Sequence, residues 1–458
     1  MKNKVNRRNF LKTTTAAGLG LALTPGPAFG KNYSPTQKKV SIGFIGVGGR
    51  GRSHLDLITQ RKDVKVPAIC DTDPDAISRA QKILRNHGFD EAETYTENDY
   101  SYRKLLERDD IDGVLIATPW VWHSPMSVDA MKAKKYVGIE VPAATTLDGC
   151  WDLVHTHEET GTHLMFLENV NYAREVLAVL QMLRDNLFGT PVHATCGYQH
   201  DLRGVKFDGV EFGKGTHGEA RWRTQHSLKR NADLYPTHGV GPVAKWFNIN
   251  TGNRFEYLTS VATKSEGLHD YIVDHPEGGP DHPNAKLDWK LGDIVTTVIK
   301  TANGETIIIS HDTNLPRPYS WGFTLHGTEG IWNGQYEGRR IYIEGKSKHH
   351  QWETGEAYDA WMKKYDHPLW KKYAEDARNA GHGGIDYFTD RTFVECVKQN
   401  VHPPMDVYDA AAWSAITPLS EKSISLGSQP VNFPDFTGGR WIKRKPIFGN
   451  REKFLSGQ

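Results

Sequence analysis

Apolar runs alternate with helix-length amphipathic stretches from residue 40 to about residue 172. The first run, residues 40–47, is continuously apolar and ends in glycines, as a buried parallel strand does. Alternating strands and helices at this spacing predict a doubly wound parallel α/β sheet, which forms a first domain over residues 40–172. The other expected strands are residues 64–70, 113–118, 136–141 and 163–169, and the expected helices are a stretch ending near residue 61 and residues 74–85, 124–134 and 147–160.

The pattern changes at about residue 191 to longer β-patterned segments. Asn303-Gly304 separates two of them, and an Asn-Gly between alternating runs predicts a hairpin. We therefore expect a second α/β domain over residues 173–458 that contains an antiparallel sheet. Its expected strands are residues 192–199, 257–263, 294–301 and 305–311, its long functional loops are 201–240 and 312–358, and helices at 384–399 and 409–423 should pack back on the first domain.

A glycine pattern follows the first strand and opens the first helix. In GxGxxG the first glycine makes a tight turn, the second admits a pyrophosphate, and the third lets helix and strand pack. Asp71 stands 20 residues after the last of these glycines, where a carboxylate binds the adenosine ribose and repels a 2′-phosphate. The motif predicts NAD rather than NADP, although Arg50 could serve a phosphate. The expected contacts are Gly46, Gly48, Gly49, Arg50, Gly51 and Asp71.

Aromatic and polar residues follow the other strands of the first domain. Since the carboxyl ends of parallel strands share one edge, these residues should converge on one crevice. Trp120 and Trp122 would flank the nicotinamide or a sugar, or cover the sheet edge, and His123 would cap the next helix or touch the cofactor. The cofactor-binding residues expected here are Pro119, Trp120, Trp122, His123, Glu140, Val141 and Asn169.

The first thirty residues have the pattern of an export signal. Arg7-Arg8 precedes a short apolar run, residues 16–23, and small residues follow, which predicts a twin-arginine signal peptide over residues 1–30 and a linker over 31–39. The run is well short of the ~20 apolar residues that cross a bilayer, so we expect no stable membrane insertion. The protein should be periplasmic or extracellular, and should carry its cofactor out of the cytoplasm.

Charge narrows the classes of partner. Residues 1–30 contain five basic residues and no acidic one, and the remainder of the chain has a formal charge of −4. A slightly acidic body has no electrostatic reason to bind a polyanion, so we expect no nucleic-acid partner. No HExxH pattern accompanies the histidines, and we expect no metal.

The order of these elements resembles the superfamily of glucose-fructose oxidoreductase and inositol dehydrogenase (Gfo/Idh/MocA). That resemblance implies an N-terminal Rossmann domain and a C-terminal α/β domain with an open-faced, largely antiparallel sheet. Dehydrogenases of this superfamily typically carry Glu-Lys-Pro after the fifth strand, and the lysine helps to move the proton of the alcohol. Here the lysine position is Val141, which cannot relay a proton, so another group does this work or the chemistry differs.

Three longer motifs sharpen the resemblance. Residues 221–226, 235–242 and 406–414, together with Glu140-Val141-Pro142 and the leader, are similar to the family 109 glycoside hydrolases, which are known for α-N-acetylgalactosaminidase activity. In that family bound NAD⁺ withdraws hydride from C3 of the sugar, the aglycone is eliminated, water adds, and the hydride returns. The resemblance implies a glycan substrate with a terminal N-acetylgalactosamine.

The same resemblance implies a sugar site in the second domain. His238, Tyr198 and Tyr235 are the candidate catalytic residues, with the roles of acid and base left open between them. Arg223 would hold the hydroxyls or the N-acetyl carbonyl of the sugar. The substrate-binding residues implied are Tyr198, Arg223, Tyr235, Pro236, Thr237, His238 and Tyr319.

Two other functions fit parts of the sequence. A sugar or polyol NAD-dependent dehydrogenase is disfavoured by Val141 and by export to a compartment without an NAD pool. A non-catalytic sugar-binding protein would not need proton-transfer groups in the crevice. The sequence leaves the oligomeric state open, although an open-faced sheet often pairs with a second copy to form a homo-oligomer.

Overall fold

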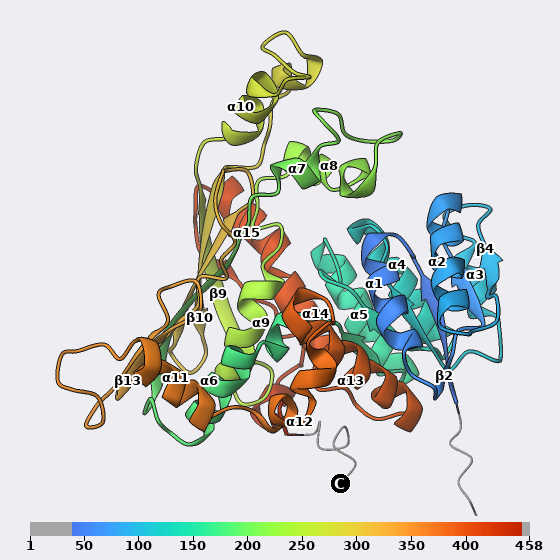
Figure 1. Cartoon of the computed structure of the whole chain (residues 1–458). Helices are drawn as coiled ribbons and strands as arrows, with labels where there is room; N and C mark the ends of the chain where they lie inside the picture. Colours follow the sequence, from blue (N-terminus) through green and yellow to red (C-terminus); the bar gives the residue numbers. More distant parts are fainter. Residues whose placement is uncertain (1–38, 451–458) are drawn as a thin grey trace, which may run out of the picture. The chain divides into compact units, whose positions relative to one another are not determined.

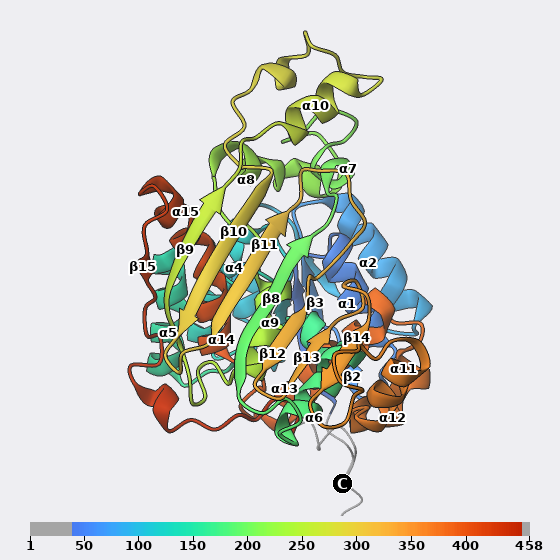
Figure 2. The same ribbon diagram turned by 90° about the vertical axis from the view of Figure 1, so that its left-hand side faces the viewer.

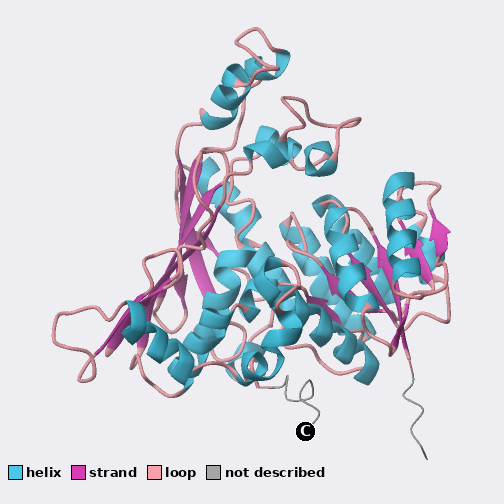
Figure 3. Ribbon diagram, viewed as in Figure 1, coloured by secondary structure: helices cyan, strands magenta, loops and turns pink. Residues whose placement is uncertain are grey.

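The computed structural model describes residues 39–450 and contains two β-sheets with helices between them (Figure 1, Figure 3). The predicted signal peptide, residues 1–30, and nearly all of the linker lie outside the described residues. Within the described residues, no helix combines the length and the apolar character needed to cross a bilayer.

The first sheet has seven strands, and every pair in it is parallel. Its strand order is β4-β3-β1-β5-β6-β7, with β2 also beside β1, so the order reverses between β1 and β5. Strands and helices of this part are β1 (Val40–Ile45), α1 (Gly49–Thr59), β2 (Val64–Lys65), β3 (Ala68–Cys70), α2 (Pro74–Asn86), β4 (Glu93–Tyr95), α3 (Tyr102–Leu106), β5 (Gly113–Ile116), α4 (Trp120–Lys132), β6 (Tyr136–Ile139), α5 (Leu147–Thr160) and β7 (Leu164–Phe166).

The second sheet has eight strands in the order β14-β13-β12-β8-β11-β10-β9-β15. All its pairs are antiparallel except β8 with β11. The strands are β8 (Pro191–Gln199), β9 (Phe255–Ala262), β10 (Ile294–Thr301), β11 (Thr306–Asp312), β12 (Thr324–Gly327), β13 (Gly330–Asn333), β14 (Arg340–Ile343) and β15 (Val431–Asn432). The predicted fold class, a parallel doubly wound sheet plus a largely antiparallel open-faced sheet, is confirmed.

Helices lie against one face of the second sheet, and Figure 2 shows its strands from the other face. The remaining α-helices are α6 (Arg174–Arg184), α7 (Arg203–Lys206), α8 (Thr224–Lys229), α9 (Thr237–Trp246), α10 (Gly267–Asp274), α11 (Gly355–Lys364), α12 (Pro368–Ala377), α13 (Ile385–Gln399), α14 (Val407–Ser414) and α15 (Ile416–Ser425). Short 3-10 helices are η2 (Asn169–Tyr172), η3 (Gly218–Arg221), η4 (Pro283–Lys286), η5 (His382–Gly384) and η6 (Arg440–Ile442). Helix α9 packs on β8, while α13 packs on α1 and β1.

Several predicted elements differ from the structure, among them the strand predicted at 64–70, which is divided into β2 and β3. Helix α4 begins at Trp120 and not at Ser124, because the Ser124 hydroxyl does not cap a helix but donates to Gly149 O at 3.0 Å. The helix predicted at 409–423 is broken at Ala415 into α14 and α15. Pro418 lacks the N–H that would bond back across this break. The stretch 312–358 contains three strands of four residues each, too short to leave a period-2 pattern.

Helix α9 approaches the end of β8 unusually closely. A Cβ placed on Gly239 would lie 2.6 Å from the backbone nitrogen of Gly197. Only a pair of glycines permits this backbone contact without displacing the strand. Because of it, the first turn of α9 lies directly beside the carboxyl end of β8.

A buried ionic cluster joins α1 to α13. Arg50 donates from Nε to Glu140 at 2.6 Å and from Nη1 to Asp386 at 2.7 Å. His54, which is fully buried, lies between Glu140 at 2.7 Å and Asp390 at 2.6 Å. Burial and Arg50 both lower the pKa of His54, but the Asp390 and Glu140 carboxylates outweigh them and raise it to about 9. His54 is therefore an imidazolium at neutral pH.

Protein stability should depend on pH through His54. Its pKa is higher in the folded chain than its ordinary value of 6.5. Its stabilising contribution is therefore complete below about pH 6.5 and is lost as the pH rises toward 9. Urea unfolding of wild type and His54→Asn should show a difference in the free energy of unfolding that is larger at pH 6 than at pH 9, by up to ~3 kcal/mol.

The matched control for this measurement is His269→Asn. His269 is exposed on α10 and pairs only with its neighbour Asp270 among the contacts of the described chain. We expect this substitution to change stability by less than ~0.5 kcal/mol at either pH. A loss for His54→Asn that is equal at pH 6 and pH 9 would show that the imidazolium is not the stabilising form.

Candidate active site

The turn between β1 and α1 has the geometry that its glycines predict. Gly46 has a φ of +84°, and a Cβ on it would lie 2.6 Å from the Ala117 carbonyl oxygen. A Cβ on Gly51 would collide with the Gly46 carbonyl. By contrast, a Cβ on Gly48 or Gly49 would meet no atom within 4 Å. The first and third glycines of the motif serve packing, whereas the middle ones leave the surface open.

The residues at this edge fit a dinucleotide. Helix α1 begins at Gly49 without a side-chain cap, so the amides of its first turn are available to a pyrophosphate. Asp71 directly follows β3, where it accepts hydrogen bonds from Val47 N at 2.8 Å and Asp73 N at 2.9 Å. Asn169 donates to Asp386 at 2.7 Å, and its Oδ1 is buried without a protein partner. That orphaned acceptor is consistent with a ligand amide.

Some predicted cofactor residues have other partners. Arg50 is engaged by the carboxylates of the ionic cluster, which leaves it little freedom to serve a phosphate. His123 lies within α4, between the carbonyls of Pro142 at 2.7 Å and Thr118 at 2.6 Å. Burial lowers the pKa of His123. Because both ring nitrogens of His123 lie against backbone carbonyls, neither is available to a cofactor.

The two tryptophans that follow β5 pack against different domains. Pro119 immediately precedes α4, and Trp122 packs edge-on against Tyr100, with ring centroids 5.5 Å apart. Trp120 instead stacks on Tyr235 of the second domain at 5.4 Å. Glu140 belongs to the ionic cluster, and the neighbouring Val141 is buried.

The predicted sugar-site residues form one aromatic cluster. Tyr198, at the end of β8, lies 4.7 Å from Tyr235, 5.4 Å from His238 and 5.9 Å from Tyr319, measured between ring centroids. Tyr235 and His238 are 5.0 Å apart. With Trp120 stacked on Tyr235, the cluster connects the edge of the first sheet to the end of the second. We call Trp120, Tyr198, Tyr235, His238 and Tyr319 the aromatic cluster.

His238 is oriented by a carboxylate that the sequence prediction omitted. Its Nδ1 lies 2.9 Å from each oxygen of Glu168, which is fully buried just after β7. An ionised carboxylate only accepts, so the hydrogen shared by this pair belongs to Nδ1, and Nε2 of a neutral imidazole in this tautomer has the lone pair. Glu168 also accepts from Val170 N at 2.9 Å. The pair therefore presents a base-competent nitrogen in a fixed orientation.

Arg223 is buried within the aromatic cluster. Its guanidinium carbon lies 4.8 Å from the Trp120 ring centroid and 4.9 Å from that of Tyr235, and it pairs with Glu219. Burial lowers the pKa of Arg223, but Glu219 and the two phenols Tyr198 and Tyr235 outweigh burial and raise it. Arg223 is thus a permanently charged donor surrounded by ring faces.

The phenols of Tyr198 and Tyr319, near the end of β8, both have raised pKa values. Burial raises the pKa of Tyr198, and Arg223 only partly opposes it. Burial likewise raises the pKa of Tyr319, whose hydroxyl accepts from Trp321 at 2.5 Å. The Tyr198 hydroxyl lies 3.3 Å from His200 Nδ1. At neutral pH both phenols are hydrogen-bond donors.

Two of the predicted substrate-binding residues form the start of α9. Pro236 immediately precedes this helix, and Thr237 is its first residue. Thr237 is fully buried, and its hydroxyl has no protein partner.

Glu168, Glu219 and His200 are the functional candidates that the sequence prediction missed. Glu168 had a signal, because it stands near the end of the strand predicted at 163–169, at the expected crevice edge. Glu219 stands four residues before Arg223, the spacing of a helical ion pair. His200 carries no such pattern.

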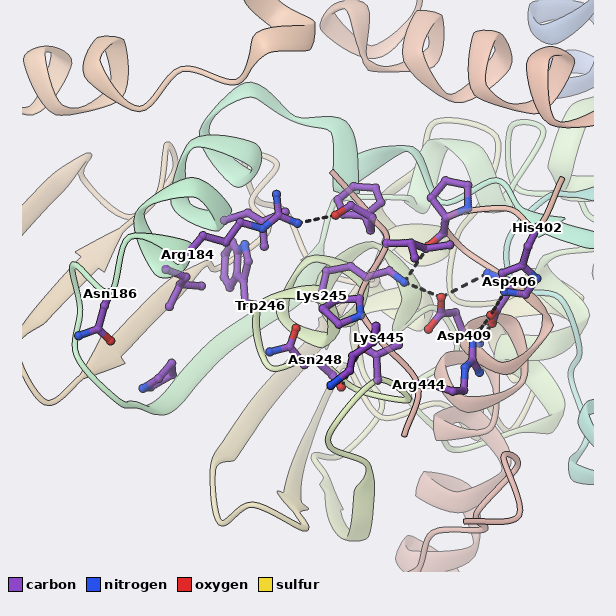
Figure 4. A pocket seen from close by; sticks show the side chains of 18 of the residues that line it. Arg184, Asn186, Lys245, Trp246, Asn248, His402, Asp406, Asp409, Arg444 and Lys445 are labelled. Atoms are coloured by element: carbon purple, nitrogen blue, oxygen red, sulfur yellow. Dashed lines mark hydrogen bonds and ion pairs between the residues drawn. The ribbon is translucent and has the colours of Figure 1, made fainter. Parts of the chain in front are cut away.

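A cavity of about 430 Å³ lies away from the aromatic cluster, and no predicted site residue lines it. Figure 4 shows its ionic groups: Lys245 pairs with Asp409 at 2.5 Å, and Arg444 pairs with Asp406. The first pair joins the last turn of α9 to the first turn of α14, and the second joins the segment after Lys443 to the residue that caps α14. The cavity is therefore distinct from the predicted site.

Comparison with known proteins agrees with this geometry. Residues 40–167 match the NAD-binding Rossmann fold of an oxidoreductase family, and residues 172–443 match the C-terminal domain of glycosyl hydrolase 109. An α-N-acetylgalactosaminidase of Tannerella forsythia is 49% identical over 96% of this chain and 99% of its own length. A glycosyl hydrolase family 109 protein of Stenotrophomonas maltophilia is 47% identical over 98% of this chain and 99% of its own length.

Solved structures share the fold. A levoglucosan dehydrogenase in complex with NADH and levoglucosan superposes with a TM-score of 0.64 and 19% identity, covering 86% of this chain and 100% of that one. Similarity at this level shows the fold alone. The Rossmann domain is NAD-binding, and the matched domains with the curated relatives confirm the resemblance: the chain belongs to glycosyl hydrolase family 109.

Proposed function

We propose that the chain hydrolyses terminal α-linked N-acetylgalactosamine by transient oxidation of the sugar at C3, elimination of the aglycone and addition of water. The near relative named α-N-acetylgalactosaminidase supports the substrate. When bound, NAD supplies the hydride acceptor for C3 and returns the hydride at the end of each turnover. The observation that carries the proposal is the Glu168-oriented His238 beside Tyr198, within one aromatic cluster that reaches the cofactor edge through Trp120.

His238 is the base in this proposal. Oxidation at C3 releases the hydride to NAD and the proton of the C3 hydroxyl to solvent, and both return when C3 is reduced at the end of the turnover. The ketone makes the proton on C2 acidic, and removal of that proton drives elimination. Nε2 of His238 has the free lone pair for this step, because Glu168 holds the hydrogen on Nδ1. Glu168 also stabilises the imidazolium that forms.

Tyr198 is the proton donor to the departing oxygen. Its raised pKa keeps the hydroxyl protonated at neutral pH, which suits a donor better than a base. Arg223 anchors the sugar by donating to its hydroxyls or N-acetyl carbonyl. Trp120 and Tyr235 supply flat apolar surfaces for the sugar face.

The buried Val141 distinguishes this proposal from a conventional dehydrogenase. A valine side chain cannot accept the proton of an alcohol that is being oxidised. A hydrolase that recycles its cofactor also needs no external NAD. Val141 separates the chain from dehydrogenases that use a lysine at this position, and the recycled cofactor favours hydrolysis over net oxidation.

One assay tests the proposed reaction. Purified protein is incubated in deuterated water with an aryl α-N-acetylgalactosaminide and no added NAD. We expect release of the aglycone with deuterium at C2 of the sugar. Release without deuterium would contradict elimination. Formation of NADH from a free sugar without release would instead identify a dehydrogenase, and no reaction with retained sugar would identify a binding protein.

Substitutions at the aromatic cluster test the residue roles. His238→Ala and Tyr198→Phe should each lower turnover by ~10²-fold or more, because each removes a proton-transfer group. NAD content of the purified variants, measured after denaturation, should match wild type. The control His193→Asn alters a histidine of β8 whose Nδ1 contacts Thr306, and should leave turnover nearly unchanged. Wild-type turnover in either test variant would exclude its proposed role.

We also propose export by the twin-arginine route to the periplasm or the cell exterior. The paired arginines and short apolar run of residues 1–30 support it. The protein recovered from the native host should begin near residue 31, as read by N-terminal sequencing. An intact N-terminus on protein from the cytoplasm would contradict export.

A further inference from the structure

Residues 203–229, which we call the strap, include α7 and α8, which lie beyond the end of the second sheet and above the first domain in Figure 1. The strap contacts the first domain through several side chains. Arg223 and His226 lie against the Trp120 ring, 4.8 Å and 5.0 Å from its centroid. Arg221 and Trp222 make two further contacts. Arg221 Nη1 lies 3.1 Å from Asp73 Oδ2. The adjacent Trp222 packs edge-on against Trp120, with ring centroids 5.1 Å apart.

These two contacts bracket the path of a bound dinucleotide. In a doubly wound sheet the dinucleotide lies across the carboxyl ends of the strands, with its adenosine ribose at the acidic residue that ends the second strand. Asp73 is two residues beyond that residue, Asp71, and caps α2. Trp120 opens α4 after β5, on the other side of the switch point. A segment fixed at both positions crosses the dinucleotide between them.

The base of the strap is anchored separately. Lys206 is fully buried and donates to Thr313 Oγ1 at 2.8 Å and Asn314 Oδ1 at 2.5 Å, just after β11. Its carbonyl accepts from the Thr224 hydroxyl. The base is therefore held by buried bonds, whereas the ion pair at the tip is exposed, with 45% of the Arg221 side chain and 30% of Asp73 open to solvent. The strap can therefore open at residues 221 and 222 while its base stays in place.

We infer that the strap closes over bound NAD and slows its release, with Arg221 and Trp222 as the retaining residues. The inference rests on NAD binding at this edge and does not depend on the sugar or the reaction. It accounts for how a chain proposed to recycle its cofactor keeps it between turnovers. Since an exposed ion pair contributes little, Arg221 should change release several-fold, and the ring packing of Trp222 should matter more.

The test is the rate at which the full-length holoprotein releases NAD. Protein loaded with radiolabelled NAD is chased with excess unlabelled NAD, and the bound label is followed by rapid desalting without sugar. Arg221→Gln and Asp73→Asn should each speed release about 3-fold, and the double variant should be no faster than either one. Trp222→Ala should speed release by about 10-fold or more. Asparagine at position 73 keeps the cap of α2.

Arg203→Gln is the matched control. Arg203 is an arginine of the same strap, but its carboxylate partner is Asp201, at 2.8 Å, and not a residue of the first domain. We expect release as slow as wild type. Equal acceleration by Arg203→Gln, or unchanged release in both Arg221→Gln and Trp222→Ala, would overturn the inference.

Other outcomes are also decisive. If Arg221→Gln does not fold, judged by its thermal unfolding temperature, the release rates of Arg221→Lys and Asp73→Asn are compared with wild type instead. A wild-type protein that holds no label would overturn the inference. Slow release from a protein that cleaves no glycoside would contradict the proposed function and leave the inference supported.

Discussion

The buried ionic cluster is the constraint on which the site depends. A charge removed from water is tolerated only where it is paired and hydrogen-bonded, so Arg50, His54, Glu140, Asp386 and Asp390 must meet in one arrangement. Arg50 and Asp386 are 336 positions apart in the chain, as are His54 and Asp390. Their pairing fixes the loop that carries the glycines and the turn that carries Val141. The position of both relative to η2 follows from Asn169, which donates to Asp386.

The site itself is assembled at a meeting of two sheet edges. The first sheet supplies Glu168 and Trp120 from the ends of its strands, and the second supplies Tyr198 from the end of β8. Helix α9 completes the set, because the glycine contact between Gly239 and Gly197 brings His238 within reach of both edges. Neither edge holds the aromatic cluster alone. A reaction between a sugar and a dinucleotide needs a site of this kind, where residues of both domains meet.

Much of this could be predicted from sequence where the signal is local. GxGxxG, Asp71 and the strand–helix alternation predict the first sheet, since each is a pattern of a few adjacent residues. The motif around His238 also indicates a helix start at the site. By contrast, the partners of Arg50 and the carboxylate behind His238 are distant in sequence, and no periodicity marks them. Ser124-Pro125 has the residue types of a helix start, so the sequence placed the start of α4 there. In the structure the Ser124 hydroxyl instead donates to Gly149 O.

Helix α13 has a consequence for any recombination of this chain with its relatives. Although it lies near the end of the sequence, it is packed as a part of the first domain. Phe393 occupies the space beside Gly138, where a Cβ would lie 2.7 Å from its ring, and Val397 does the same beside Gly113. A chimera divided near residue 172 would exchange one side of this contact without the other. Segments that fold as one body must be transferred together, so 385–399 belongs with the N-terminal half in such a design.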